Sequence, residues 1–532
     1  MIDKLSMQHR ILIATVLSFA FFAAYDYFFI PKVQPSQEQN LSVQTTSAAS
    51  AISQNSTPNN GAPTTATTPS IAPTVGDTTQ YIATIKAEHY EIKIDALGRV
   101  SKFFLNDAKY RQEDGSRIQL IEPSFKPYPL EIRFSDTALN NEAFAVTYSA
   151  DQANVTLDGQ SKTIILTQAL ANNTITKTIT FNPNGSYNVK VNLSTPAEYF
   201  ITPGSRPNVA VDGYTFHGVL VKQADDTLLV IADGDAKGNE RAIDAPMLAA
   251  ADKYYASLFY NYEKGFDVVV SQGKDETGIL FVKAQGDLTL NGYIGPKDHR
   301  QLNAIDKRLT DVIEYGWFTF IAKPVFLLLS YIHSLLGNWG WSIVVMTLLI
   351  RLVLYPLTYK GMVSMNKMKE LAPKVKELQA KYKGEPQKLN AHMMELYKKH
   401  GANPMGGCLP ILMQIPVFFA IYRVLQNAIE IKAEPWILWV TDLSVMDPYF
   451  VLPIAMGVSM FVQQRLTPTN FTDPMQEKIM KFLPLIFTFF FVTFPAGLTL
   501  YWFVNNLFSI AQQSYVNRLF AKRKEAEKAA HK

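Results

Sequence analysis

Residues Trp339–Lys360 read WGWSIVVMTLLIRLVLYPLTYK, a hydrophobic stretch that carries one charge, Arg351, well inside it. A bilayer core about 30 Å thick is crossed by roughly 20 apolar residues in a helix, so this stretch is long enough to span a membrane. An arginine within such a helix costs about 2.5–3.5 kcal/mol on insertion scales. We therefore predict a membrane helix whose arginine is retained for a function.

Around this stretch the chain divides into a polar part and a hydrophobic part. All six tryptophans of the 532 residues fall between Trp317 and Trp502, and thirteen of the sixteen methionines fall between Met346 and Met480. The net charge of +4 is too small to indicate a nucleic-acid-binding protein. The single cysteine, Cys408, excludes an intrachain disulfide. This distribution predicts a polar domain joined to a membrane domain.

The first 80 residues form two segments. Residues 1–30 contain the apolar run ILIATVLSFAFFAAYDYFFI, which follows Lys4 and Arg10. A signal peptide and a transmembrane anchor both contain such a run, and the lack of a small-residue cleavage site favours an anchor with a cytoplasmic N-terminus. Residues 31–80 are rich in Ser, Thr, Ala, Gln and Pro, which predicts a flexible periplasmic linker.

Residues 81–305 are expected to form an all-β periplasmic domain. The stretch TITKTITFNPNGSYNVKVNL alternates apolar and polar residues on both sides of a turn at 182–186, as a hairpin does. Similar short strands recur to about Tyr293 and predict a sandwich of antiparallel sheets. The three histidines of this region are far apart, and no paired-carboxylate motif accompanies them. The sequence therefore assigns no chemistry to this domain.

Residues 311–336 are apolar but are interrupted by Lys323, Pro324 and His333. They are consistent with a spanning helix or with an amphipathic helix that lies along the interface. A further crossing here would put the basic segment after Tyr359 outside the cell, against the positive-inside rule. We therefore expect the interfacial helix.

Residues 359–404 form the most basic segment, with ten lysines against four glutamates, and are expected to be cytoplasmic. Apolar residues recur at helical spacing, and Gly384-Glu385-Pro386 separates one helix from a second at about 387–400. A helical hairpin follows from this pattern. Its Met-rich stripe is either the seam between the two helices or an adaptable surface for hydrophobic clients.

The rest of the core, residues 338–518, is expected to contain five spans, which makes six with the anchor. A basic cytoplasmic tail follows at 519–532. The expected spans after the Arg351 helix are 406–429, 449–464, 482–495 and 497–517. In this topology the tryptophans at 317, 339, 341, 436 and 439 all fall near the outer interface, as an aromatic belt does.

The later spans contain no Asp or Glu that could pair with Arg351. Arg351 therefore either snorkels to the inner leaflet or faces water and a transient acidic group. Polar side chains of the neighbouring helices favour a wet cavity, although each could serve an ordinary interhelical hydrogen bond. These polar residues and the aromatic at the head of the last stripe are Thr347, Gln414, Trp502, Asn505, Ser509 and Gln512.

At these residues the chain resembles the YidC family of membrane-protein insertases, in the form with a large periplasmic domain. The resemblance rests on the segments IRLVLYPLT, SMNKMKELAPKVKELQAKY, NPMGGCLPILMQIPVFFAIY, LWVTDLSVMDPYFVLPIAMGVSMF, TDPMQEKIMKFLPLIF and FPAGLTLYWFVNN, within residues 310–520. It implies a polytopic helical bundle with a periplasmic β super-sandwich. It also implies a hydrophilic groove in the inner leaflet.

The family's groove arginine, threonine and glutamine fall on Arg351, Thr347 and Gln414. A tyrosine of the last span falls on Trp502, beside Tyr501, so this chain departs from the family there. The resemblance implies cytoplasmic contacts with clients or ribosomes through residues of the hairpin. Those residues are Met362, Met365, Met368, Lys374 and Lys381.

The resemblance implies an inner-membrane insertase and chaperone, not an enzyme, that needs no cofactor. Its implied partners are nascent membrane proteins, the ribosome, the Sec translocon (SecYEG and SecDF) and membrane lipids. The sequence contains no G-x-x-x-x-G-K-[ST] nucleotide motif. Two rival functions are a solute transporter and an anchored carbohydrate-active enzyme. The sequence shows no internal repeat of the kind that a transporter would have. It shows no acid–base pair of the kind that a carbohydrate-active enzyme would need.

Overall fold

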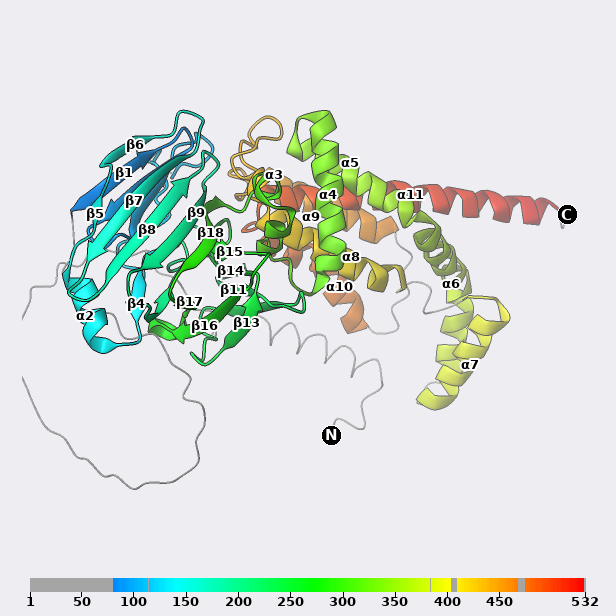
Figure 1. The fold of residues 1–532 in the computed structure, drawn as a ribbon. Coiled ribbons are helices and arrows are strands. Elements are labelled where there is room, and N and C mark those ends of the chain that lie inside the picture. The colour runs from blue at the N-terminus through cyan, green and yellow to red at the C-terminus, as the bar shows by residue number, and fades with distance from the viewer. Residues whose placement is uncertain are drawn as a thin grey trace, which may run out of the picture.

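The computed structural model describes residues 80–112, 114–213, 215–382, 384–402, 409–466 and 474–530. A β domain and a helical bundle lie side by side (Figure 1). The predicted anchor at 1–30, the linker up to residue 79 and Cys408 lie outside the described residues.

The β domain contains three sheets. Their strand orders are β3-β2-β1-β6, β13-β16-β17-β10-β4 and β12-β11-β14-β15-β18-β9-β8-β7-β5. The strands are β1 (Tyr81–Lys86), β2 (Tyr90–Asp95), β3 (Val100–Leu105), β4 (Ile132–Phe134), β5 (Ser149–Ala150), β6 (Asn154–Thr156), β7 (Lys162–Ala169), β8 (Thr174–Phe181), β9 (Ser186–Leu193), β10 (Glu198–Ile201), β11 (Gly218–Lys222), β12 (Leu228–Ala232), β13 (Arg241–Ala245), β14 (Met247–Ala251), β15 (Tyr255–Tyr260), β16 (Phe266–Gln272), β17 (Gly278–Gln285) and β18 (Leu288–Pro296).

The predicted hairpin is confirmed, because β8 and β9 pair antiparallel on both sides of the turn. Three details correct the all-β, antiparallel expectation, and the first is helix α3 (His299–Ile305) at the end of the expected range 81–305. Helix α2 (Thr137–Ala145) lies within the domain, and its N-cap Asp136 accepts a hydrogen bond from the Leu139 N–H. Strands β1 and β6 pair in parallel. Alternation predicts a strand but not whether its partner runs parallel, and the nine residues of α2 are too few to show a clear helical stripe.

The nine-stranded sheet joins the two halves of the molecule. All residues of β14, MLAAA, are buried. Leu248 and Ala250 face the sandwich core, whereas Met247, Ala249 and Ala251 pack into the apolar core shared with the helices. Because successive side chains of a strand point to opposite faces, one short strand serves both cores.

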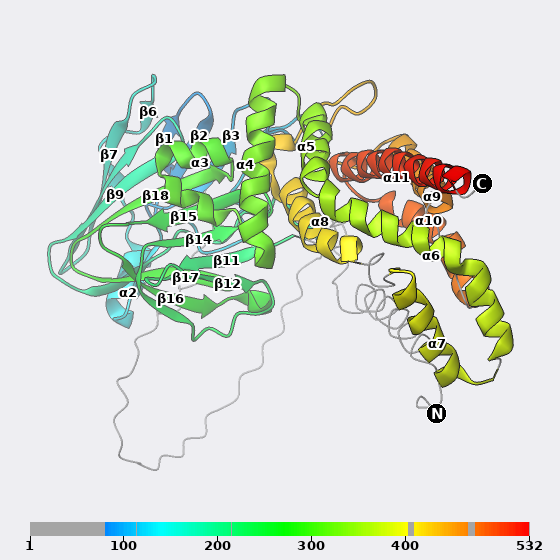
Figure 2. The same ribbon diagram turned by 90° about the vertical axis from the view of Figure 1, so that its right-hand side faces the viewer.

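The helices follow the β domain in the chain. Helix α4 runs across the direction of α11 at the end of the bundle that faces the β domain, in both views (Figures 1 and 2). The helices are α3 (His299–Ile305), α4 (Thr319–Leu336), α5 (Trp339–Val353), α6 (Tyr355–Lys381), α7 (Pro386–Lys399), α8 (Leu409–Asn427), α9 (Val451–Leu466), α10 (Pro474–Phe491) and α11 (Ala496–Ala530), with short 3₁₀ turns η2 (Lys274–Glu276), η3 (Lys307–Val312), η4 (Gly316–Phe318) and η6 (Ile429–Ile431).

The opening stretch, Trp339–Lys360, is not one straight helix. Helix α5 ends at Val353, and the chain bends by 66° into α6. Pro356, in the first turn of α6, explains the break, because proline has no N–H to donate and clashes with the preceding turn. Arg351 therefore lies in the last turn of α5 and not in the middle of a long span.

The hairpin prediction is confirmed with small changes of boundary. Helices α6 and α7 are separated by a turn that contains Gly384, whose φ of 95° suits glycine. By length and hydropathy, Gly316–Leu336 is a candidate membrane span, and the bent pair α5–α6 is a second. The six-span count and the interfacial position of 311–336 therefore stay predictions. The tail from residue 519 continues α11 as helix to Ala530.

Candidate functional site

Arg351 is buried at the C-terminal end of α5, with 6% of its surface exposed. Its Nε donates to Asn505 Oδ1 at 2.8 Å, and its Nη2 donates to Ser509 Oγ at 2.7 Å and to the Asn505 carbonyl at 3.3 Å. The sequence predicts a guanidinium that snorkels to the inner leaflet or faces water and a transient acidic group; in the structure its hydrogen bonds go to an amide, a hydroxyl and a carbonyl of α11. The carbonyl end of a helix dipole also favours a cation at this place.

Among the described residues, none accepts a hydrogen bond from Nη1 of Arg351, and none of its bonded partners is acidic. An arginine has five N–H groups in a planar fork that suits a carboxylate. Three of these groups are occupied by α11. The two on Nη1 are available to an acidic group that enters the site.

Thr347 and Tyr501 complete the buried surroundings of the arginine. Thr347 is fully buried one turn before Arg351, and its hydroxyl donates to the Ile343 carbonyl of its own helix. Tyr501 is buried one turn before Asn505 on α11 and lies near enough to Arg351 to interact electrostatically. The spacing of residues 501, 505 and 509 could have revealed Tyr501 as the hydroxyl of this face.

Trp502 is directed elsewhere. Its ring contacts Phe418 edge-on with centroids 4.6 Å apart, and it also packs against Phe487 and Phe491. These rings join α8, α10 and α11. Gln414 is half-buried on α8. The structure thus brings Arg351, Asn505 and Ser509 together, while Trp502 belongs to a neighbouring aromatic cluster.

The hairpin residues lie on α6. The three predicted methionines, Met362, Met365 and Met368, are half-buried, whereas Lys374 and Lys381 are exposed. Lys374 contacts His400 Nε2 at 3.2 Å, and Tyr382 stacks on His392 across the hairpin at 4.7 Å between centroids. Leu371 and Val375 are buried, and α6 packs against α7. Part of the apolar stripe is therefore the seam between the two helices.

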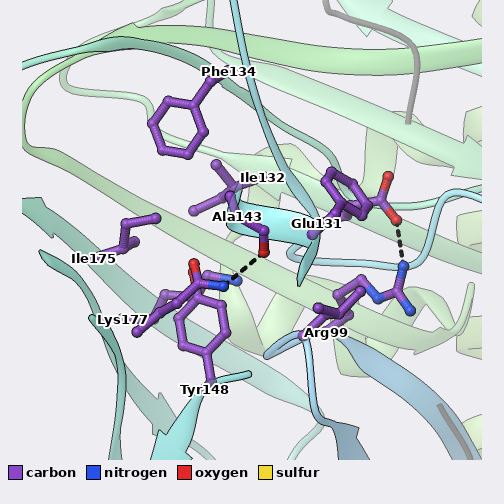
Figure 3. Close-up of a pocket in the computed structure, with 11 residues that line it drawn as sticks. Arg99, Glu131, Ile132, Phe134, Ala143, Tyr148, Ile175 and Lys177 are labelled. Atoms are coloured by element: carbon purple, nitrogen blue, oxygen red, sulfur yellow. Dashed lines mark hydrogen bonds and ion pairs between the residues drawn. The ribbon is translucent and has the colours of Figure 1, made fainter. Parts of the chain in front are cut away.

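The β domain contains an ion cluster that the sequence reading did not find, formed by Asp95, Arg99, Glu131 and Lys177. Arg99, Glu131 and Lys177 line a cavity of about 10 Å³, room for one water molecule (Figure 3). Arg99 donates to Asp95 Oδ2 at 2.8 Å and to Glu131 Oε2 at 2.9 Å.

Lys177 is fully buried in this cluster, where its Nζ donates to the Gly98 and Leu130 carbonyls at 3.0 and 2.8 Å. Desolvation lowers the pKa of Lys177 to about 7, opposed in part by Asp95 and Glu131. In the sequence, Lys177 takes a core-facing position between Ile175 and Ile179. A lysine at a core-facing position of a strand was the sequence signal that could have revealed a buried charge.

A second buried charge, Glu430, lies where the β domain meets the bundle. Its Oε1 accepts from the His299 N–H at 2.8 Å, and its carbonyl accepts from Lys109 Nζ at 2.8 Å. Lys109 also pairs with Glu434 at 3.0 Å. Desolvation, and then Asp298, raise the pKa of Glu430 to about 7. This junction ties the loop after α8 to the β domain.

The comparisons with known proteins match both halves. The family model described as "60Kd inner membrane protein" matches residues 331–524, and that described as "YidC periplasmic domain" matches residues 208–328. A protein of Campylobacter jejuni named "Membrane protein insertase YidC" is 54% identical over 521 residues, 98% of each chain. One of the same name from Wolinella succinogenes is 51% identical and covers 99% of this chain and 98% of its own.

A solved structure titled "Active YidC insertase crystal structure with the first transmembrane domain resolved" is also similar. It is 18% identical, with a TM-score of 0.37, and the match covers 81% of this chain and 93% of that chain.

Proposed function

The chain belongs to the YidC family of membrane protein insertases, and we propose that it inserts clients through a hydrophilic groove whose charged wall is Arg351. In this proposal, hydrophobic client segments arrive from the cytoplasm and leave sideways into the lipid of the inner membrane. The protein also acts as a chaperone for clients that fold beside it. No catalytic step is required.

The observation that carries the proposal is the charge balance at Arg351. The described partners of its guanidinium are neutral, and two N–H groups remain for a visiting carboxylate. Asn505 and Ser509 hold the arginine only by side-chain and carbonyl contacts of one helix. A client with an acidic outgoing tail therefore has a counter-charge to meet partway across the membrane.

The physical purpose of such a groove is to shorten the path through hydrocarbon. Each polar group that loses water without a new partner costs several kcal/mol. Thr347, Gln414, Asn505 and Ser509 are proposed to supply hydrogen bonds along the client's path. Trp502 and its aromatic neighbours offer apolar contact, and burial of the client's apolar surface in lipid drives release.

We further propose that the protein has six spans with both termini in the cytoplasm and the β domain in the periplasm. The orientation of α4 across α11 supports its place along the outer interface (Figure 2). Hairpin α6–α7 would meet the ribosome or arriving clients through Met362, Met365, Met368, Lys374 and Lys381. Handover from the Sec translocon, through SecYEG and SecDF, is part of the same proposal.

The test is insertion into proteoliposomes of one client with an acidic translocated tail and of its Asp→Asn, Glu→Gln twin. Arg351→Ala is expected to reduce insertion of the acidic client about tenfold, since a hydrogen bond to a charged group is worth about 1.5 kcal/mol or more. Arg351→Lys should be milder. Leu352→Ala is the matched control, because Leu352 follows Arg351 on the same helix and its side chain is 57% exposed. Equal insertion of both clients by Arg351→Ala would refute the electrostatic role.

The path itself is tested by photocrosslinking from Thr347, Gln414 and Trp502 to a ribosome-stalled membrane protein. The control position is Val353, which is 78% exposed and close to Arg351 along the chain. Crosslinks to the nascent chain from the three positions, with lipid adducts from Val353, are expected. Lipid adducts alone from all four positions would count against the groove.

A further inference from the structure

The outer loop, residues 432–450 between η6 and α9, lies beside the start of α5 (Figures 1 and 2). Its exposed side chains are mostly large and apolar. The large apolar ones are Leu438 at 79%, Tyr449 at 68%, Met446 at 53%, Val445 at 51%, Phe450 at 40% and Ile437 at 37% exposure. Of its three acidic residues, Asp447 is fully buried, and Glu434 and Asp442 are half-buried.

Several polar groups of the outer loop have partners in the loop or in the elements beside it, whereas Trp436 Nε1 is buried without one. The buried carboxylate of Asp447 accepts from Trp439 Nε1 at 3.0 Å, from the Tyr449 N–H at 3.0 Å and from the Leu452 N–H at 2.7 Å. The Trp436 N–H donates to the Val440 carbonyl. Irregular backbone is tolerated near lipid only when its polar groups have partners, as the backbone groups named here do.

The outer loop is fixed to the ends of α5 and α11. Asn338, which is separated from α4 by Gly337 and caps α5, donates through Nδ2 to the carbonyls of Pro435 and Trp436. The Ala496 and Gly497 N–H groups, at the start of α11, donate to loop carbonyls. The loop therefore lies at the level where α4 ends, at the end of the bundle that faces the β domain.

The exposed loop surface continues along α9. Val451, Ile454, Val458 and Phe461 are exposed at helical spacing on that helix, directly after Phe450. In a membrane protein, an exposed apolar stripe on a bundle helix contacts lipid. Contact with lipid also explains the exposed apolar side chains of the loop, because the two surfaces are contiguous in the chain and alike in composition.

We propose that the outer loop is embedded in the outer leaflet, at the boundary between headgroups and acyl chains, and anchors the bundle in depth. Tyr449 and Trp436 are residue types that favour this boundary. Arg351 is twelve residues beyond Trp339 on α5, or about 18 Å along the axis. With the loop at the outer boundary of a core about 30 Å thick, the arginine lies in the inner half.

The experiment uses the full chain with Cys408→Ser and a single new cysteine at Leu438 or Tyr449, labelled with an environment-sensitive fluorophore. Controls are Asp158→Cys, in an exposed turn of the β domain, and Leu485→Cys, which is 68% exposed on α10. The protein is reconstituted in phosphatidylcholine–phosphatidylglycerol vesicles with quenchers placed near the headgroup or deep in the acyl chains. Iodide serves as the aqueous quencher.

Labels at both loop positions are expected to emit at shorter wavelength than the Asp158 label in the same vesicles. They should be quenched most by the shallow lipid quencher and less than the Asp158 label by iodide. Emission and iodide quenching equal to those of the Asp158 label would place the loop in water and overturn the proposal. Quenching mainly by the deep quencher, as expected for Leu485, would overturn the interfacial depth.

Discussion

Two arginines are almost equally buried in this protein, one in each half, and their surroundings differ in charge. Arg99, in the β domain, is 7% exposed and pairs with Asp95 and Glu131. Arg351, in the bundle, is 6% exposed and bonds only to Asn505 and Ser509 among the described side chains. The charge of Arg99 is neutralised by carboxylates of the fold, whereas the charge of Arg351 remains available to an acidic group of a client.

The difference separates a structural charge from a functional one. A buried arginine with two carboxylates uses its fork fully and gains little by binding anything else. A buried arginine with neutral partners keeps its long-range field and its spare donors. Burial alone therefore does not identify a working residue, but burial without a counter-charge does point to one.

The largest effect is expected for Arg99→Met. It would leave Asp95 and Glu131 buried with one fewer counter-charge, which costs about 3–5 kcal/mol when a buried pair is broken. Arg117→Met, which breaks an exposed pair with Glu91, is the control and should cost less than about 1 kcal/mol. β-sheet circular dichroism of the full chain in detergent during urea unfolding measures both. A loss for Arg99→Met no greater than that of the control would break the comparison.

Lys177, in the same buried cluster as Arg99, should make the stability of the β domain depend on pH. Its pKa in the fold is about 7, below its ordinary value of 10.5, so the unfolded chain binds the extra proton between these values. The free energy of unfolding of the β domain should therefore rise with pH from about 7 to 9.5, on the order of 2–3 kcal/mol. Lys177→Met should abolish this rise, whereas Lys190→Met, at an exposed position of β9, should keep it. Identical pH slopes in the two variants would contradict the assignment.

Glu430 tests whether the two halves are independent. Its pKa is raised to about 7 in the fold, so the folded junction binds the extra proton between pH 4.5 and 7, and stability should fall as pH rises through this range. The groups that face it are Asp298, His299, Lys109, Glu434, Tyr110 and Tyr315.

Glu430→Gln mimics the protonated acid and should remove this fall, on the order of 2 kcal/mol. All tryptophans lie in residues 317–502, so tryptophan emission reports the bundle while circular dichroism reports the sheets. Both transitions should move together. A shift of one transition alone would show that the junction does not couple the halves.

The sequence predicted the features with strong local patterns. The hairpin at β8–β9, the turn at Gly384 and the grouping of Asn505 with Ser509 all follow from alternation or helical spacing. It missed features that depend on several distant segments. Asp95, Arg99, Glu131 and Lys177 come together only when three sheets fold, and Glu430 meets His299 only at the junction. The bend after α5 could have been read from Pro356, but the long apolar run outweighed it.

The smallest effect on stability is expected for Arg351→Met. A small effect would mean that Arg351 is not needed to hold the fold together. Removal of the guanidinium leaves Asn505 and Ser509 without one partner each, and interhelical hydrogen bonds in membranes are worth about 0.6 kcal/mol on average. The desolvation penalty of an uncompensated charge disappears at the same time. The free energy of unfolding, followed by tryptophan emission during thermal unfolding in detergent, should therefore change by less than about 1 kcal/mol. Leu352→Met is the control. A loss as large as that of Arg99→Met would make Arg351 a structural residue like its counterpart, and the charge difference between the two sites would no longer mark function.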